Sequence, residues 1–215
     1  MTQTGTEVQS NLDWVIGKED DKGIKVDLDA PTYPWMDLIG LVQPDTSSPT
    51  LEPSLETFVG SVKAYEYDLN DELHAKFHIP HDWVLGHDAR IHMHWAHNGT
   101  AISGTMAFSV NAMYADRDTG IFSAKTLDSI TVATPDIATI PQYQHFVTEV
   151  DLTTSGGSST TLDSDDIEVD GIIAVSFKMT AEPNITAGHL FMFTSDVHYQ
   201  STGVGTKNNA SPFYT

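Results

Sequence analysis

The chain has 215 residues, with 30 Asp and Glu against 10 Lys and Arg, a formal net charge of −20 and no cysteine. The acidic excess argues against nucleic acid as a partner, because a phosphate backbone is bound by Lys and Arg. The lack of cysteine excludes disulfides, thiolate zinc sites and a thiol nucleophile. No stretch has the ~20 consecutive apolar residues of a membrane span, and the first residues lack a signal-peptide pattern. We therefore expect a soluble protein that is not exported and binds no membrane.

Residues 1–57 show no sustained helical or strand periodicity, and recurring prolines favour an extended backbone. The segment nevertheless contains isolated large apolar side chains, whereas a disordered tail is usually poor in aromatic residues. We predict an extended N-terminal arm that contacts its own domain or a neighbouring subunit through Trp14, Tyr33, Trp35 and Met36. The alternative is a meandering first pair of strands of the same domain.

From residue 58 the pattern changes to short β-type segments separated by turn residues. The pattern predicts an all-β fold over residues 58–203, an antiparallel two-sheet β-sandwich of jelly-roll type, followed by a C-terminal tail over 204–215. Asn98-Gly99 has the composition of a two-residue hairpin turn between two of these strands. The Ser-, Thr-, Gly- and Asp-rich stretch 153–166 is predicted to be an exposed loop. The predicted strands cover residues 58–69, 88–97, 100–115, 127–133, 146–152, 171–180 and 190–199.

Alternation along these strands also predicts the buried face. The predicted core includes Val62, Ile91, Met93, Trp95, Met106, Phe108, Val110, Ile173, Val175, Phe177, Phe191 and Phe193.

Histidine is concentrated in residues 78–97, and the last part of this stretch alternates with apolar residues. On a strand, His92 and His94 project from the same face. Two imidazoles at this spacing suit zinc, iron or copper, but zinc needs three or four ligands. We predict His92, His94 and His97 as candidate ligands of a structural metal ion, with no other cofactor. The alternatives are a proton-linked subunit contact and hydrogen-bonded histidines without metal.

Two enzyme families share short pieces of this pattern. His92-Met93-His94-Trp95 resembles the zinc-binding strand of alpha-carbonic anhydrases, but no downstream motif supplies their third histidine. Gly86 followed by His92-x-His94 resembles the opening of the cupin motif, but residues 98–100 stand where its glutamate is expected. These resemblances imply the alternative of a metal-dependent β-fold enzyme. Two acidic turns, 116–120 and 163–166, could also chelate calcium.

A longer stretch, Phe77 to Gly86 with Asp88 and the His92-x-His94-Trp95 strand, resembles a pattern in virion proteins of tailed bacteriophages. The aromatic arm before it and the tail Tyr199–Gly203 after the last strand fit the same pattern. The resemblance implies a non-enzymatic jelly-roll virion protein without catalytic residues, assembled in the host cytoplasm. We expect a capsid decoration, or cement, protein that binds the major capsid protein. A homotrimer would match local threefold positions of the shell. The alternatives are a head–tail connector, or a fibre or baseplate component that binds carbohydrate.

Overall fold

The structure is a computed structural model that describes residues 13–19, 22–27, 33–47, 49–118, 120–133 and 136–203. The chain divides into two compact units, residues 1–34 and 35–215. In the first unit, strand β1 (Asp13–Glu19) pairs antiparallel with β2 (Lys22–Asp27). Among the described residues, no helix is long and apolar enough to cross a membrane. The predicted tail over 204–215 lies outside the described residues.

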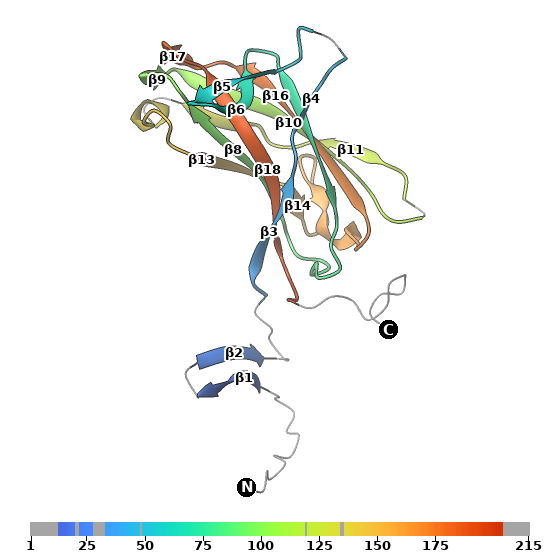
Figure 1. Cartoon of the computed structure of the whole chain (residues 1–215). Helices are drawn as coiled ribbons and strands as arrows, with labels where there is room; N and C mark the ends of the chain where they lie inside the picture. Colours follow the sequence, from blue (N-terminus) through green and yellow to red (C-terminus); the bar gives the residue numbers. More distant parts are fainter. Residues whose placement is uncertain are drawn as a thin grey trace, which may run out of the picture. The chain divides into compact units, whose positions relative to one another are not determined.

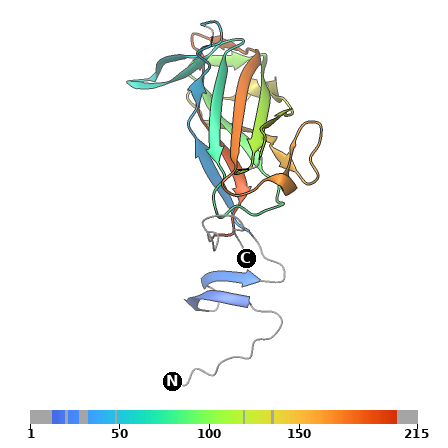
Figure 2. The same ribbon diagram turned by 90° about the vertical axis from the view of Figure 1, so that its right-hand side faces the viewer.

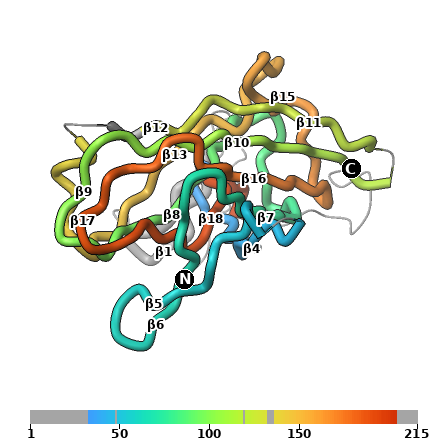
Figure 3. The backbone as a smooth tube through the Cα atoms, turned by 90° about the horizontal axis from the view of Figure 1, so that it is seen from above, coloured from blue at the N-terminus to red at the C-terminus, as the bar shows by residue number. Residues whose placement is uncertain are grey.

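The second unit contains two six-stranded sheets, which we call the groove sheet and the histidine sheet. They lie face to face in the views of Figures 1 and 3. The groove sheet has the order β11 (Ser123–Thr126), β10 (Thr105–Ala115), β16 (Ile172–Ala181), β7 (Glu72–His78) and β4 (Gln43–Pro44), and β12 (Ile130–Ala133) also pairs with β10. The histidine sheet has the order β13 (Phe146–Asp151), β8 (Arg90–His97), β18 (Leu190–Gln200), β6 (Val62–Tyr67) and β5 (Ser54–Val59), and β3 (Trp35–Gly40) also pairs with β18.

Every pairing within these two sheets is antiparallel. The predicted antiparallel jelly-roll-type sandwich is therefore confirmed. Short elements complete the unit: β9 (Ala101–Ser103) paired with β17 (Asn184–Thr186), β14 (Thr153–Thr154) paired with β15 (Leu162–Asp163), and the 3₁₀ turns η1 (Ile137–Thr139) and η2 (Ser164–Asp166).

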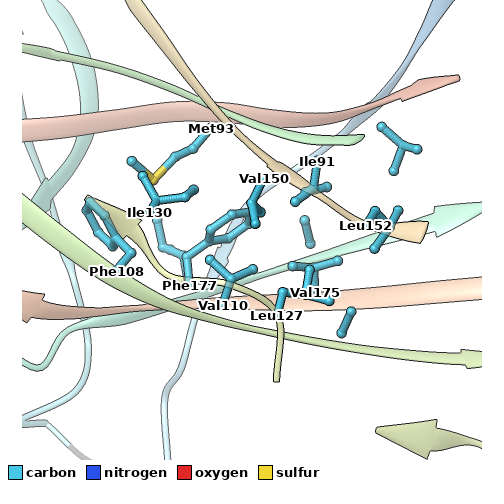
Figure 4. Packing of buried hydrophobic residues seen from close by; sticks show 14 of the residues in the cluster. Ile91, Met93, Phe108, Val110, Leu127, Ile130, Val150, Leu152, Val175 and Phe177 are labelled. Carbon is cyan, nitrogen blue, oxygen red and sulfur yellow. The ribbon is translucent and has the colours of Figure 1, made fainter. Parts of the chain in front are cut away.

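The core lies between the two sheets, where alternate residues of β8, β10 and β16 meet (Figure 4). Ten predicted core residues are at most 2% exposed: Ile91, Met93, Trp95, Met106, Phe108, Val110, Ile173, Val175, Phe177 and Phe191. Two predictions were wrong, since Val62 is 56% and Phe193 is 36% exposed. Val62 lies on the outer part of a hairpin, and Phe193 lies at the register shift of β18 between Met192 and Thr194.

One buried hydroxyl joins the two sheets. Tyr67 of β6, in the histidine sheet, is 1% exposed. Its hydroxyl donates to the carbonyl oxygen of Phe177 in β16 at 2.5 Å and accepts the backbone N–H of Leu73 in β7 at 2.9 Å. A polar group at this depth is stable only because both of its hydrogen bonds are made.

The sandwich begins earlier in the chain than predicted. Residues 35–57, which we expected in an extended arm, contribute β3, β4 and most of β5 to the two sheets. Strand β3 pairs with β18 from Trp35↔Gln200 to Gly40↔Ser195. The alternative of early strands in the same domain thus describes this segment, and Phe58 lies inside a strand. The short, proline-separated runs concealed strands whose partners lie far away in the sequence.

The predicted hairpin at Asn98-Gly99 was also wrong. Strand β8 before it belongs to the histidine sheet, β9 after it pairs with β17, and β10 belongs to the groove sheet. Gly99 is needed for close approach, since an added Cβ would lie 2.3 Å from Ile185 Cγ2 and 2.7 Å from the carbonyl oxygen of Thr186. Because β8 and β10 belong to different sheets, the chain crosses from one sheet to the other between residues 98 and 104.

Part of the predicted loop over 153–166 is buried. Thr153, Thr161, Leu162 and Ser164 are at most 4% exposed. Leu162 belongs to the core cluster, and the β14–β15 pairing holds this segment against the body. Asp163 Oδ1 accepts the backbone N–H of Asp165 at 3.0 Å, which caps η2.

The hairpin formed by β5 and β6 projects from the sandwich (Figure 2). Strand β6 pairs with β18 only at Tyr65 and its two following residues, so in the described chain the outer part of β6 pairs with β5 alone. Leu55, Val59 and Val62 are 51%, 44% and 56% exposed on this hairpin. A two-stranded ribbon with exposed apolar side chains has little stability of its own in water.

The segment around Trp83 contacts the end of β18. Trp83 is 1% exposed and stacks on Tyr199, with ring centroids 4.9 Å apart. Asp82 accepts hydrogen bonds from the Tyr199 hydroxyl at 3.1 Å and from the Ser201 hydroxyl at 2.5 Å. The backbone N–H of Val84 donates to the carbonyl oxygen of Gln200 at 3.0 Å. This segment, which we call the Asp82 turn (residues 79–84), fixes the end of β18.

Candidate functional site

A cluster of histidines and carboxylates covers the outer face of the histidine sheet. His92 and His94 of β8 point away from the core, as their alternation with Ile91 and Met93 predicted. The antiparallel register places Asp196 of β18 opposite His92 on one side. On the other side Glu149 of β13 lies opposite His92. Three neighbouring strands therefore bring two imidazoles and two carboxylates together.

His92 is held between two carboxylates. Its Nδ1 lies 3.0 Å from Asp196 Oδ2, and its Nε2 lies 3.2 Å from Glu149 Oε2. Interaction with Asp196 raises the pKa of His92, burial opposes this shift, and Glu149 adds to it. Glu149 is itself fixed by Arg90, whose Nη1 donates to Glu149 Oε1 at 2.7 Å. The imidazole therefore has a defined orientation on the sheet.

Asp196 is the most buried member of the cluster, with 4% of its side chain exposed against 13% for His92 and 20% for His94. Its Oδ1 is hydrogen-bonded to His94 Nε2. Burial alone would raise the pKa of Asp196, but the close approach of His92 and the hydrogen bond with His94 outweigh burial and lower it. The carboxylate is therefore ionised and directed at both imidazoles.

Stacked rings extend the cluster in both directions. His94 stacks on His145, and their Nδ1 and Nε2 atoms are joined by a hydrogen bond of 2.9 Å. On the other side His198 lies between His92 and Trp35, with ring centroids 5.0 Å and 4.7 Å away. Asp37 of β3 closes this end through a 2.6 Å contact with His198 Nδ1.

The structure separates the three predicted metal ligands. His92 and His94 lie together with Asp196, but His97 is fully buried and its Nε2 bonds to the carbonyl oxygen of Ile140 at 3.0 Å. His97 has the same parity along β8 as Trp95, so its side chain leaves the strand on the inner face. The prediction of His97 as a ligand was therefore wrong.

The predicted interface residues have different environments. Trp35 and Met36 are 47% and 48% exposed on β3, and Tyr33 is partly buried. The side chain of Trp14 lies outside the described part of the chain. The exposed Trp and Tyr on which carbohydrate binding would depend include Trp35 and Tyr143, the latter 46% exposed. Trp35 and Tyr143 are therefore candidates for contact with a partner.

Sequence reasoning missed Asp196, Glu149 and His145 as members of the cluster. A usable signal was present, since Asp196 and His198 alternate along the predicted strand 190–199 in the same way as His92 and His94. The sequence contains no indication that these two strands are neighbours.

A concave feature lies on the groove sheet. It is a groove of about 420 Å³ with a mainly apolar lining of small side chains, to which His74, Asn111 and Ser176 add polar groups. The described lining residues include no Trp, Tyr or Phe. The groove therefore lacks the aromatic platform on which a sugar ring could stack.

No family model matches the chain, and no curated protein matches it. Solved structures with a similar fold include the carbohydrate-binding and GH10 modules of xylanase 10B from Clostridium thermocellum with xylohexaose (12% identity, 81% of this chain and 27% of that chain, TM-score 0.35). The chain thus spans about a quarter of that protein. A carbohydrate-binding module specific for non-crystalline cellulose gives 9% identity over 69% of this chain and 79% of that module, with a TM-score of 0.36. Similarity at this level assigns no function to this chain.

Proposed function

We propose that this chain is a non-enzymatic structural protein of a tailed-bacteriophage virion, a capsid decoration protein that forms a homotrimer and binds the major capsid protein. The observation behind this proposal is the β5–β6 hairpin. Leu55, Val59 and Val62 are about half exposed on it, although large apolar side chains each contribute roughly 1.5–3 kcal/mol when fully buried. Covering them on a neighbouring subunit would therefore yield about 1 kcal/mol each.

The geometry favours a second copy of the chain as the partner of the hairpin. A projecting element that docks on a different surface of the next copy forms a heterologous contact, and three such contacts can close into a ring. The acidic excess keeps free subunits soluble before assembly. The resemblance to virion proteins rests on the sequence from Phe77 to Gly86 and on the tail Tyr199–Gly203, and these two stretches contact each other at the Asp82 turn.

The test compares assembly of the full-length chain with that of a hairpin variant. Val59 and Val62 are paired at the tip, so Val59→Glu with Val62→Glu places two charges in the proposed contact. Light scattering should give a trimer for the unchanged protein and a monomer for this variant. Ile121→Glu is the matched control, because Ile121 is an apolar side chain that is 90% exposed away from the hairpin, and this variant should remain trimeric.

Co-sedimentation with heads that lack the protein tests the second half of the proposal. The trimer should sediment with the heads, and the hairpin variant should remain in the supernatant. A monomeric unchanged protein that does not bind heads would contradict the decoration role. Binding to a glycan array by such a monomer, lost in Trp35→Ala, would favour the carbohydrate-binding alternative.

A further inference from the structure

The outer face of the histidine sheet has the donor arrangement of a metal site. The donor atoms of His92, His94 and Asp196 all lie within 4.8 Å of one another. Two nitrogen donors and one carboxylate oxygen are a ligand set that Zn²⁺ accepts, with a fourth position left for water or another donor. All three side chains lie on adjacent, hydrogen-bonded strands, so the sheet holds their spacing.

The groups behind the two imidazoles orient them for a metal ion. His92 Nε2 lies 3.2 Å from Glu149 Oε2, so a proton on Nε2 leaves the Nδ1 lone pair directed at the centre of the cluster. His94 Nδ1 is hydrogen-bonded to His145 Nε2, which can leave the Nε2 lone pair directed at the same centre. Metal-binding histidines commonly donate their remote N–H to such acceptors.

The buried carboxylate provides a second, independent reason. Asp196 Oδ2 is buried and accepts no hydrogen bond of good geometry from the described residues, although His92 Nδ1 lies 3.0 Å away. Two imidazole lone pairs and a carboxylate that face one centre repel each other unless a cation lies between them. Protons fill that role in part, and a divalent ion would fill it completely.

We infer that His92, His94 and Asp196 bind one divalent transition-metal ion such as Zn²⁺, and that Glu149 and His145 position the two imidazoles. This inference does not depend on the proposed role in the virion. It differs from the sequence prediction in its third ligand, which is Asp196 and not His97. The ion would join β8 to β18, and its remaining coordination position would face outward from the sheet.

The experiment is calorimetric titration of the full-length, chelator-treated protein with ZnCl₂. One Zn²⁺ ion should bind per chain, and an excess of MgCl₂ or CaCl₂ should not displace it, because those ions prefer oxygen donors. Asp196→Asn and His94→Gln should each weaken Zn²⁺ binding at least tenfold. Glu149→Gln should weaken it about 10-fold while the stoichiometry stays at one, as expected for a positioning residue.

Matched controls separate this site from other histidines. His74 lies on the groove sheet, and His189 belongs to a different cluster with Glu66 and Asp68. His74→Ala and His189→Ala should leave affinity unchanged. His198→Ala tests the neighbouring group of Asp37, His92 and His198, and it should have a smaller effect than His94→Gln.

No saturable Zn²⁺ binding by the unchanged protein would overturn the inference. Loss of binding in His198→Ala or His189→Ala, with binding retained in His94→Gln, would also overturn it. If Asp196→Asn does not fold by circular dichroism, the partly exposed His94 and Glu149 variants decide the outcome.

Discussion

Removal of the Tyr67 hydroxyl tests whether the two sheets are joined in the way that the structure shows. The change Tyr67→Phe removes one oxygen atom and retains the ring, which packs edge-on against Phe108 with centroids 5.4 Å apart. The change leaves the Leu73 N–H without its acceptor and the Phe177 carbonyl without one donor. Both groups then lie in a region that water does not reach.

The two losses differ in size. A backbone N–H has one hydrogen to donate, so leaving that of Leu73 unpaired costs about 1–3 kcal/mol. A carbonyl oxygen has two lone pairs, so Phe177 loses only one bond of roughly 0.5–1.5 kcal/mol. We therefore expect Tyr67→Phe to lower the free energy of unfolding by about 1.5–4.5 kcal/mol.

Urea denaturation followed by circular dichroism measures this change, and the slope with denaturant should stay constant if only stability is altered. Tyr199→Phe is the matched control, because that hydroxyl donates a single 3.1 Å hydrogen bond to Asp82 in a partly buried site. It should cost about 1.5 kcal/mol, the lower end of the range for a hydrogen bond to a charged group. A loss below about 0.5 kcal/mol for Tyr67→Phe would refute the argument, since no unpaired buried group costs so little.

Three further changes have defined outcomes. Burial raises the pKa of Asp71 in the folded protein. Between the ordinary carboxyl pKa and this raised pKa, the folded state binds more protons than the unfolded state. The free energy of unfolding therefore falls as the pH rises through that range. Asp71→Asn should therefore be more stable than the unchanged protein at pH 7 in urea titrations, and the difference should disappear below about pH 4. Deleting residues 1–34 should leave the thermal midpoint of the sandwich nearly unchanged. Deleting residues 1–40 also removes β3 and should lower the midpoint. Equal midpoints for the two deletions would contradict the assignment of β3 to the sheet. Gly188→Ala should destabilise more than Gly60→Ala in thermal melts. A Cβ at Gly188 would lie 2.3 Å from a backbone nitrogen, whereas one at Gly60 meets nothing within 4 Å and adds only the strain of a left-handed backbone at φ +60°. The reverse order would contradict this packing.

The parts of the fold that follow from local alternation could be predicted from the sequence. Strands β10 and β16 alternate for eight residues or more and β8 alternates over Arg90–Trp95, and each buries the predicted face. The same alternation placed His92 and His94 together. Alternation also places His97 on the opposite face, so this error was avoidable from the sequence alone.

The parts that depend on pairing between distant strands could not be predicted in this way. Asp196 completes the cluster with His92 only because β8 and β18 are neighbours, and neighbouring strands leave no local pattern that names their partners. Asn98-Gly99 has hairpin composition, but the chain crosses to the other sheet at this point. Val62 alternates like a core residue, yet β6 extends beyond the body of the sandwich there.

The position of β18 sets the order in which the sandwich can form during synthesis. This strand ends at Gln200, and β3, β6 and β8 all pair with it. A nascent chain therefore holds three strands of the histidine sheet without their common partner until β18 has left the ribosome. Unpaired strand edges promote aggregation in that interval. A chain truncated before Leu190 should accordingly be recovered as aggregate or with chaperones, whatever the stability of the complete protein.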